Sequence, residues 1–519
     1  MNKIEAIKLE RDGLAVKDMI ALYAKSGWES IPEADIQRLK WYGLFLRNPT
    51  PGFFMIRVRI PGGKTGSYQL KALAAIAGTY GNGVLDLTTR QQIQLRHIKI
   101  EDVPAVFAKM EEVGLTSLQT GMDNVRNVMT CPVAGLSPDE VSDATQIVRA
   151  INEEILGNPA YSNLPRKFNV AVTGCPDNCV HMETQDLALV PAYHDDGHGR
   201  SVGYNVLAGG KLGSGGYRIA TPLDIFVTEG DALGVSRAVI EIFREHGSRE
   251  NRTQARLAFL LDEWGESRFR EEVETRVGKK LLLAGVDARK AVEKSHVGIY
   301  RQKQPGMNYV GLKVLVGRIT HDDLAKIAAL AEKYGTGEVR ISPAQALIIP
   351  NVSDRKIGDL DREPLVKQFA YNPSPVYKGL VSCVGSDYCN LAVIETKSRA
   401  VETAKALEAR LGSTLKPITM HWSGCPAACG NHLVADIGFL GKKAKVDGKV
   451  VDAVDIYVGG RSGPDPKLAV KIMEDVPCDR LPMVLEGLVP YHAREKMHRV
   501  RGGAKKLALG KEVSNATAA

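Results

Sequence analysis

The segments QLKALAAIAGTYGNGVLDLTTRQQIQL (69–95) and DLAKIAALAEKYGTGEVRISPAQALII (323–349) decide the fold, because they align without a gap at an offset of 254 residues. In each copy, apolar residues recur at helical spacing, a Tyr-Gly-x-Gly sequence stops the helix, and strand-like residues follow. The sequence therefore predicts that one helix and strand unit occurs twice in the chain.

Other parts of the chain repeat at nearly the same offset. TGCPDNC (173–179) matches SGCPAAC (423–429), and NVLAGG (205–210) matches DIYVGG (455–460), both 250 positions apart. Repetition along most of the length indicates two related halves, and a length of 519 residues indicates about three domains. We therefore expect an α/β (α+β) protein in which each half consists of two modules and the halves fold together about a pseudo-twofold axis.

The composition is that of an ordinary globular protein, with 25% charged and 44% hydrophobic residues. The N-terminal segment has no apolar core of signal-peptide length, and no apolar run is long enough to span a membrane. Eight cysteines in 519 residues are too sparse for a disulfide scaffold. We therefore expect a soluble protein with reduced thiols, and the net charge of +8 favours an acidic partner.

The two halves differ in their cysteines. The motifs of the second half contain four cysteines, Cys383 and Cys389 followed by Cys425 and Cys429. In the first half, Ser137 occupies the position of the fourth cysteine. Structural zinc prefers cysteine pairs separated by two to four residues. The five residues between Cys383 and Cys389 therefore favour an iron–sulfur cluster, which accepts looser spacing. Zinc stays open as the alternative for these four thiols.

The first half retains Cys131, Cys175 and Cys179. Together with His181 these cysteines could hold zinc, or they could be a degenerate copy of the repeat without a metal. Cys478 has no partner cysteine in the repeat and is expected to be a small buried hydrophobe.

The motif SCVGSDYC (382–389), followed by SGCPAACG (423–430), resembles the cluster signature of the sulfite and nitrite reductase family, whose members join a [4Fe–4S] cluster to siroheme. The resemblance extends over roughly residues 20–500 and includes the duplication. It implies a three-domain, pseudo-twofold fold with ferredoxin-like half-domains and siroheme between the halves. It also implies that Cys383, Cys389, Cys425 and Cys429 hold the cluster, and that Cys429 bridges it to the siroheme iron.

The resemblance implies domain boundaries as well. Two ferredoxin-like half-domains pair into one domain, and each repeat contributes one further domain that contacts siroheme. The expected segments are 20–120 and 300–375 for the paired half-domains, 121–285 for the siroheme and substrate-binding domain, 376–490 for the cluster and siroheme domain, and 491–519 for a basic C-terminal tail.

Siroheme carries eight carboxylates and the substrates of the family are anions, so the pocket must collect positive charge away from water. The strand-like MIRVRIPGG (55–63) places Arg57 and Arg59 on one face. Asp86 departs from the family pattern, since sulfite-reducing members tend to have an arginine there that contacts the macrocycle. By resemblance, the residues expected around the substrate are Arg57, Arg126, Lys167 and Asn169, and those expected to hold siroheme are Arg59, Arg90, Gln94, Arg166 and Cys429.

Lys167 and Asn169 bear on the choice of substrate. Sulfite-reducing members that resemble this chain usually have Lys-x-Lys here, and nitrite-reducing members have Lys-x-Asn. Sulfite is substantially a dianion near neutral pH, whereas nitrite is a monoanion. A second ammonium about 4 Å from the extra charge contributes roughly 4 kcal/mol at an effective dielectric constant of about 20, before desolvation is subtracted. The pattern therefore favours nitrite.

The resemblance implies six-electron reduction of nitrite to ammonium, with siroheme and a [4Fe–4S] cluster as cofactors and reduced ferredoxin as the electron donor. The repeat leaves no room for flavin or nucleotide domains, and AGGKLGSGG (208–216) lacks the ordered Gly-x-Gly-x-x-Gly of a dinucleotide site. We expect a monomer in a bacterial cytoplasm of cyanobacterial type, with no membrane span and no nucleic acid. Ferredoxin-dependent sulfite reduction is the nearest alternative. A monooxygenase-like enzyme of cobalamin biosynthesis and a zinc-dependent nucleic-acid-binding protein are the others.

Overall fold

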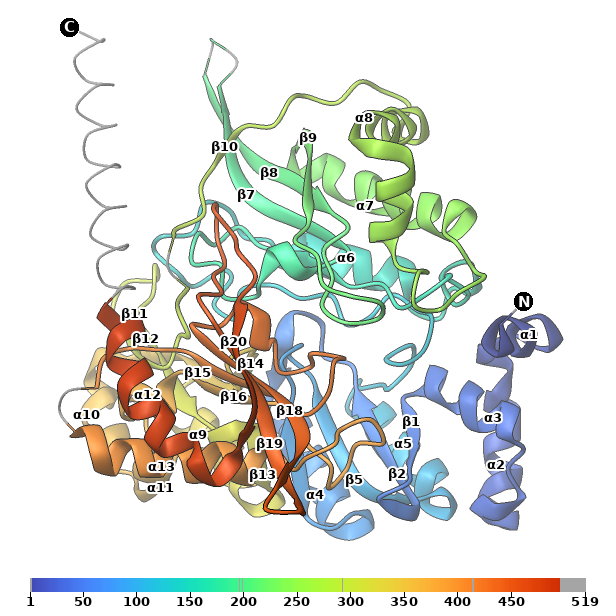
Figure 1. Cartoon of the computed structure of the whole chain (residues 1–519). Coiled ribbons are helices and arrows are strands. Elements are labelled where there is room, and N and C mark those ends of the chain that lie inside the picture. The colour runs from blue at the N-terminus through green and yellow to red at the C-terminus, as the bar shows by residue number, and fades with distance from the viewer. Residues whose placement is uncertain (1, 196, 198, 292, 413–414, 495–519) are drawn as a thin grey trace, which may run out of the picture.

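The structure is a computed structural model of the chain and describes residues 2–195, 197, 199–291, 293–412 and 415–494. Four five-stranded sheets organise these residues, and helices cover the sheets (Figure 1). No helix among the described residues combines the length and the apolar character needed to cross a membrane. Most of the expected C-terminal tail, 495–519, lies outside the described residues.

The helices and strands follow in chain order. The α-helices are α1 (Lys3–Glu10), α2 (Lys17–Ser26), α3 (Glu33–Arg38), α4 (Ser67–Tyr80), α5 (Val103–Glu112), α6 (Thr145–Ile155), α7 (Glu229–His246), α8 (Leu257–Val277), α9 (His321–Tyr334), α10 (Ile357–Asp361), α11 (Pro364–Gln368), α12 (Pro375–Lys378) and α13 (Lys397–Leu411). The strands are β1 (Leu44–Arg47), β2 (Thr50–Val58), β3 (Lys64–Gly66), β4 (Val84–Leu87), β5 (Ile93–Lys99), β6 (Val170–Val172), β7 (Leu187–Asp195), β8 (Arg200–Ala208), β9 (Thr221–Val227), β10 (Val286–Asp287), β11 (Gly298–Arg301), β12 (Met307–Lys313), β13 (Arg318–Thr320), β14 (Glu338–Ser342), β15 (Ala346–Ser353), β16 (Leu380–Ser382), β17 (Met420–Ser423), β18 (Ile437–Val446), β19 (Lys449–Val458) and β20 (Val470–Pro477).

Two of the sheets exchange a strand between the halves of the chain. One has the order β1-β2-β5-β4-β13 and the other the order β11-β12-β15-β14-β3. β13 of the second half pairs with β4 of the first, and β3 of the first half pairs with β14 of the second. Helices α4 and α9 pack against each other, and residues of both units share one apolar core. The predicted duplicated unit is confirmed as α4-β4-β5 in the first half and α9-β14-β15 in the second.

The Tyr-Gly-x-Gly sequences end the two equivalent helices for the same steric reason. A Cβ atom at Gly81 would lie 2.5 Å from the carbonyl oxygen of Arg96, and one at Gly335 would lie 2.5 Å from that of Pro350. Two residues later, Gly83 and Gly337 have φ values of +76° and +79°, which residues with a side chain rarely adopt. Both turns therefore need glycine to send the chain back into a strand beside its helix.

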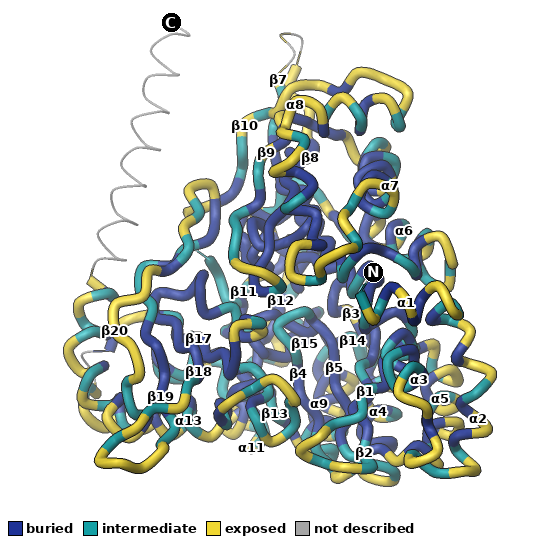
Figure 2. The backbone as a smooth tube through the Cα atoms, turned by 45° about the vertical axis from the view of Figure 1, so that its right-hand side comes forward, coloured by how far each residue is buried: buried dark blue, intermediate teal, exposed yellow. Residues whose placement is uncertain are grey.

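The other two sheets present the cysteine loops. In the first half, β6 runs parallel to β7, and in the second, β16, β17 and β18 run parallel to one another; each sheet continues antiparallel. Cys175 and Cys179 follow β6, whereas Cys383 follows β16 and Cys425 and Cys429 follow β17. Figure 2 shows that β17 is buried, and β6 and β16 are buried along their length as well, so each loop follows a buried strand.

Candidate functional site

The four cysteines of the second half lie close enough to influence one another. All eight cysteines of the chain are free, so no disulfide holds these loops. Burial, and after it repulsion from Cys429, Cys389 and Cys383, raises the pKa of Cys425 to about 12. The four thiols therefore lie near one another.

The spacing of these four sulfurs differs from that of a single-ion site. Among the described residues, three potential ligand atoms lie within 4.8 Å of one another in only two groups. One group is Cys131, Cys179 and His296, and the other is Cys175, Asp177 and His296. Around one zinc ion, tetrahedral bonds of about 2.3 Å keep sulfurs about 3.8 Å apart. The wider spacing in the second half fits a cubane cluster, in which each cysteine binds an iron at a separate corner.

The backbone of the second cysteine loop is shaped for close approach. A Cβ atom at Gly430 would lie 1.9 Å from the carbonyl oxygen of Trp422, and Ala428 has a left-handed φ of +53°. The N–H of Gly424 donates to Cys383 Sγ at 3.1 Å. Thr89, in the β4–β5 turn of the first half, donates to the carbonyl oxygen of Cys429 at 2.9 Å. Both halves of the chain therefore fix the loop that carries Cys429.

Half-buried cations gather around Cys429. Burial lowers the pKa of Arg47, Arg57 and Arg90 to about 10 each, and it lowers the pKa of Lys167 well below the ordinary value. The charge of a Cys429 thiolate raises the pKa of each of these four groups. Its sulfur therefore lies near each of them. Arg47 is a member of this group that the sequence did not single out.

This positive charge lacks counter-ions within the described part of the protein. Arg57, Arg126 and Lys167 form no ion pair with a described carboxylate. Burial and neighbouring cations lower the pKa of each of these three groups. Atoms that are buried without a hydrogen-bond partner include Nε of Arg47, Arg126 and Arg166 and Oδ1 of Asn169. Such a pocket is stable only with an anionic ligand. It fits siroheme with its carboxylates together with a small anion, and the four thiols fit a [4Fe–4S] cluster.

Asn169 is positioned by a buried ion pair that lies near Lys167. Arg256 donates to both oxygens of Asp186, at 2.8 and 2.6 Å, and Asp186 accepts the backbone N–H of Asn169 at 2.8 Å. After burial, Arg256 has the largest effect in lowering the pKa of Lys167. The equivalent Asp436 of the second half accepts the backbone N–H of Thr419 at 2.8 Å. The arrangement is thus a feature of the repeat.

Arg126 and Arg166 are anchored by protein acceptors that leave part of each guanidinium unused. Arg126 donates to the carbonyl oxygens of Thr120 at 2.6 Å and Met122 at 2.8 Å. Arg166 donates to Ser214 Oγ at 3.4 Å. Its Nη1 also lies 3.7 Å from Asp123.

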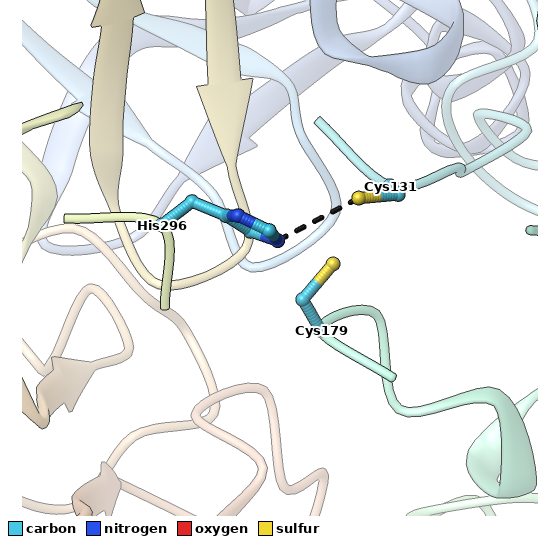
Figure 3. Close-up of side chains that lie close together, drawn as sticks. All are labelled: Cys131, Cys179 and His296. Atoms are coloured by element: carbon cyan, nitrogen blue, oxygen red, sulfur yellow. Dashed lines mark hydrogen bonds between the residues drawn. The ribbon is translucent and has the colours of Figure 1, made fainter. Parts of the chain in front are cut away.

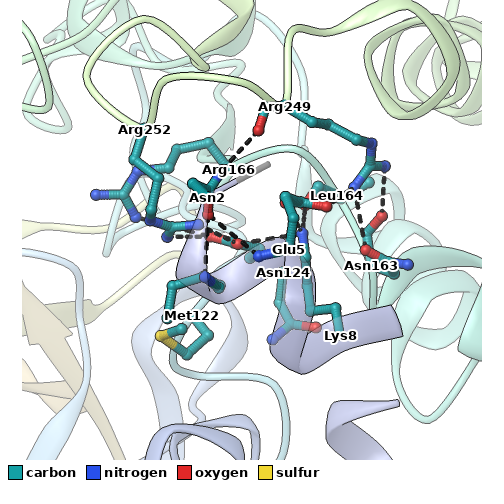
Figure 4. Close-up of polar contacts among 12 residues, drawn as sticks. Asn2, Glu5, Lys8, Met122, Asn124, Asn163, Leu164, Arg166, Arg249 and Arg252 are labelled. Carbon is teal, nitrogen blue, oxygen red and sulfur yellow. Dashed lines mark hydrogen bonds and ion pairs between the residues drawn. The ribbon is translucent and has the colours of Figure 1, made fainter. Parts of the chain in front are cut away.

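The N-terminal helix α1 braces the segment that carries Arg166. Burial opposes ionisation of Asp123, but hydrogen bonds from Arg252 at 2.7 and 2.8 Å, with the charges of Lys8 and Arg166, hold the pKa of this carboxyl below its usual value. Lys8 also donates to the carbonyl oxygen of Leu164 at 3.0 Å. Figure 4 shows these side chains converging between α1 and the Arg166 segment. No local pattern in the sequence indicates this support, because its members are far apart in the chain.

Three predicted siroheme ligands form hydrogen bonds within the protein. Gln94 accepts a hydrogen bond from Arg96 at 2.5 Å, and Arg90 donates to Gln185 at 3.1 Å. Arg59 is 2% exposed, and its acceptors are Asn152 Oδ1 and the carbonyl oxygens of Gln119, Val125 and Arg126. The geometry gives Arg59 a positioning role for the loop that carries Arg126, and its predicted contact with siroheme stays a prediction.

Asp86, which departs from the family pattern, has a structural explanation. It is 2% exposed and accepts hydrogen bonds from Arg96 at 2.8 Å and Arg318 at 3.1 Å, with Lys397 at 3.4 Å. Burial favours the neutral acid, yet Arg96, Lys397 and Arg318 hold the pKa of Asp86 far below its usual value. Arg96 and Arg318 also lie over the ring of Tyr388 in the first cysteine loop. The sequence did not identify these three cations, because they come from β5, β13 and α13.

The histidine that lies beside the first-half cysteines is not His181. His181 lies 2.9 Å from Ser462 Oγ and 3.6 Å from Glu293. The imidazole that reaches the cysteines is that of His296, in the linker before β11. A linker residue lies outside the repeat, so comparison of the two halves could not find it.

Comparison with known families matches both kinds of module. The model of the nitrite and sulphite reductase 4Fe–4S domain matches residues 121–281 and 378–507. The model of the nitrite/sulfite reductase ferredoxin-like half domain matches residues 47–113 and 300–366. Each model therefore matches once in each half.

Relatives match over nearly the whole chain. The ferredoxin–nitrite reductase of Synechococcus elongatus is 45% identical over 496 residues, with 94% of this chain and 96% of that protein covered. The assimilatory ferredoxin-dependent nitrite reductase of Haloferax mediterranei is 36% identical over 531 residues, with 96% and 90% covered. The solved structure of the Mycobacterium tuberculosis NirA protein has a TM-score of 0.87 at 31% identity, with 93% and 92% covered. The predicted fold is confirmed, and the chain belongs to the nitrite and sulfite reductase family.

Proposed function

We propose that this protein is a ferredoxin-dependent nitrite reductase that converts nitrite to ammonium in a six-electron reaction. One observation carries the proposal: half-buried cations without counter-ions lie around Cys429, beside three further cysteines, in a chain 45% identical to a ferredoxin–nitrite reductase. Siroheme and a [4Fe–4S] cluster are the cofactors. Cys383, Cys389, Cys425 and Cys429 would hold the cluster, and Cys429 would also hold siroheme.

Siroheme and the cluster would supply the one-electron reductions that nitrite requires. Arg57, Arg126 and Lys167 attract the anion and stabilise negative charge on its oxygens as they leave as water. Of these three residues, Lys167 is the one that can donate protons to the departing oxygens, because an arginine hardly deprotonates. Asn169 donates a hydrogen bond from its amide without adding a charge. Asp186, paired with Arg256, keeps the backbone of Asn169 in place.

The electron donor in this proposal is a separate acidic protein, reduced ferredoxin. The glycine-rich 208–216 segment links β8 to β9, and a Cβ at Gly213 would lie 2.8 Å from the carbonyl oxygen of Ala427. This close approach supports a packing role for the segment.

We further propose a monomer in the cytoplasm and retain the domain segments 20–120 with 300–375, 121–285 and 376–490.

The direct test of this function is anaerobic turnover of the purified holoprotein with reduced ferredoxin and nitrite. We expect ammonium to form at one molecule per six electrons consumed, with no release of intermediates. Turnover of sulfite to sulfide at a higher kcat/KM than nitrite would overturn the assignment in favour of sulfite reduction.

The Asn169→Lys variant tests the basis of substrate choice. An added ammonium favours the more highly charged sulfite, so we expect the kcat/KM ratio of sulfite to nitrite to rise at least about tenfold. Asn169→Met is the matched control, since it has similar length without charge and should not increase sulfite turnover. If Asn169→Lys leaves the ratio unchanged, charge at this position does not select the substrate.

A further inference from the structure

Four metal-ligating side chains meet in a buried part of the first repeat, apart from the four cysteines of the cluster. Cys131, Cys175, Cys179 and His296 are each at most 2% exposed. They come from the loop before α6, the turn after β6 and the linker before β11. Figure 3 shows Cys131, Cys179 and His296 pointing toward one another.

The distances among these groups match ligands around one ion. Cys131 Sγ lies 3.6 Å from His296 Nε2. The ligand atoms of Cys131, Cys179 and His296 all lie within 4.8 Å of one another, and those of Cys175, Asp177 and His296 form a second group within the same distance. Tetrahedral zinc, with bonds of about 2.3 Å to sulfur and 2.0 Å to nitrogen, separates the two ligand atoms by about 3.6 Å.

The imidazole of His296 is oriented by a second group. Its Nδ1 lies 3.1 Å from the hydroxyl of Tyr309, which is 1% exposed. A hydrogen bond from Nδ1–H to this oxygen leaves the Nε2 lone pair directed at the cysteines. Metal-binding histidines are commonly held in this way.

Nearby charges select the fourth ligand and balance the site. Asp177 Oδ1 accepts a hydrogen bond from Lys290 at 3.0 Å, and its Oδ2 lies 3.8 Å from Lys294. Because the charge of Asp177 is already paired, Cys175 is the better fourth ligand. Three thiolates and a neutral imidazole on a divalent ion leave one negative charge, which the two lysines offset.

The site has a route for an ion and apolar walls. Cys131 borders a cavity of about 370 Å³ that is also lined by the exposed Lys64 and Arg149. Behind it, the cysteines pack into an apolar cluster with residues that include Val133 and Met182. These surroundings keep bulk water away from the ligands once the ion has entered.

We propose that Cys131, Cys175, Cys179 and His296 form a structural zinc site that ties the linker between the halves to the first repeat. Ser137 occupies the position of the fourth cysteine in this copy of the motif. His296, from outside the repeat, supplies the fourth ligand instead. The ligand set of three sulfurs and one nitrogen is typical of structural zinc. The site is independent of the iron cluster, and it does not rest on the proposed reaction.

The test is elemental analysis and zinc X-ray absorption of the holoprotein, purified from zinc-supplemented medium and desalted after brief treatment with EDTA. We expect about one zinc ion per chain, with about three sulfur and one nitrogen neighbours. Iron and turnover are scored separately, so failure of this proposal is distinguishable from failure of the proposed function. Less than about a tenth of a zinc ion in iron-replete protein would overturn the site and leave a thiol–imidazole hydrogen bond in its place.

Variants provide the second measurement. Cys131→Ser and His296→Gln should each lower the bound zinc to less than about a third of the wild-type amount while iron is retained. Cys478→Ser, which removes a buried thiol outside the cluster of ligands, should retain all of it. Full zinc occupancy in both ligand variants would assign the ion to another position and refute the proposal.

Discussion

Replacing Cys425 with serine is expected to abolish the [4Fe–4S] cluster and reduce nitrite turnover to background. Cys425 is 9% exposed, and it is held between β17 and the constrained Ala428–Gly430 turn. A serine oxygen there cannot match a thiolate as an iron ligand, and the rigid loop offers no substitute. Acid-labile sulfide should fall from about four per chain to nearly zero. The measurement is sulfide and iron content of anaerobically purified protein, with turnover assayed in parallel.

The control for this experiment is Cys478→Ser. Cys478 is also buried, at 6% exposure, but it packs in the apolar core of the second repeat. Its replacement should leave sulfide, iron and turnover close to wild type. Wild-type sulfide content in Cys425→Ser would show that the cluster is held by other residues.

Replacing Lys167 with methionine is expected to lower kcat/KM for nitrite by about 10²–10⁴-fold, the usual contribution of a positioned proton donor. Among the described residues, the Lys167 ammonium has no hydrogen-bond acceptor or ion-pair partner, and cations surround it. Its charge is therefore available to the bound anion. The assay should use a small-molecule reductant in place of ferredoxin, so that donor docking does not affect the result.

The pH profile separates proton donation by Lys167 from its charge. Burial and Arg256 lower the pKa of Lys167 well below 10.5. The protonated form that can donate is lost as pH rises through this lowered value, so activity should fall at a lower pH than an ordinary lysine would give. Lys167→Arg keeps the charge but hardly deprotonates, and should keep KM within about threefold while lowering kcat. A loss below about tenfold in Lys167→Met, with the alkaline limb unchanged, would remove Lys167 from the mechanism.

The fold could be predicted because its information is repeated in the sequence. The 69–95 and 323–349 segments each carry a complete helix, turn and strand pattern, so two weak signals support each other. The four candidate cluster thiols were recognisable for a similar reason, since the second-half copies of the motifs carry four cysteines and the first-half copies carry three. Local patterns do not reveal that β3 and β13 exchange between the halves, because the pairing joins segments far apart in the chain.

The support of the site could not be predicted from local patterns. Arg59 and Arg57 alternate on one strand and looked equivalent, yet Arg59 is saturated by acceptors from residues 119–152. Asp86 departs from the arginine usual in sulfite-reducing members, and it forms ion pairs with cations from three distant elements. His296 lies in a linker without periodicity. In each case the deciding partner is distant in sequence, and a single sequence shows residue types but not these partners.

Mössbauer spectroscopy of ⁵⁷Fe-enriched holoprotein tests the central claim most directly, namely that Cys383, Cys389, Cys425 and Cys429 hold a [4Fe–4S] cluster that shares Cys429 with siroheme. The account predicts about five iron atoms per chain, four in a cubane and one in siroheme, with magnetic coupling between the two centres. A spectrum without cluster iron, or one in which cluster and siroheme iron are magnetically independent, would contradict it.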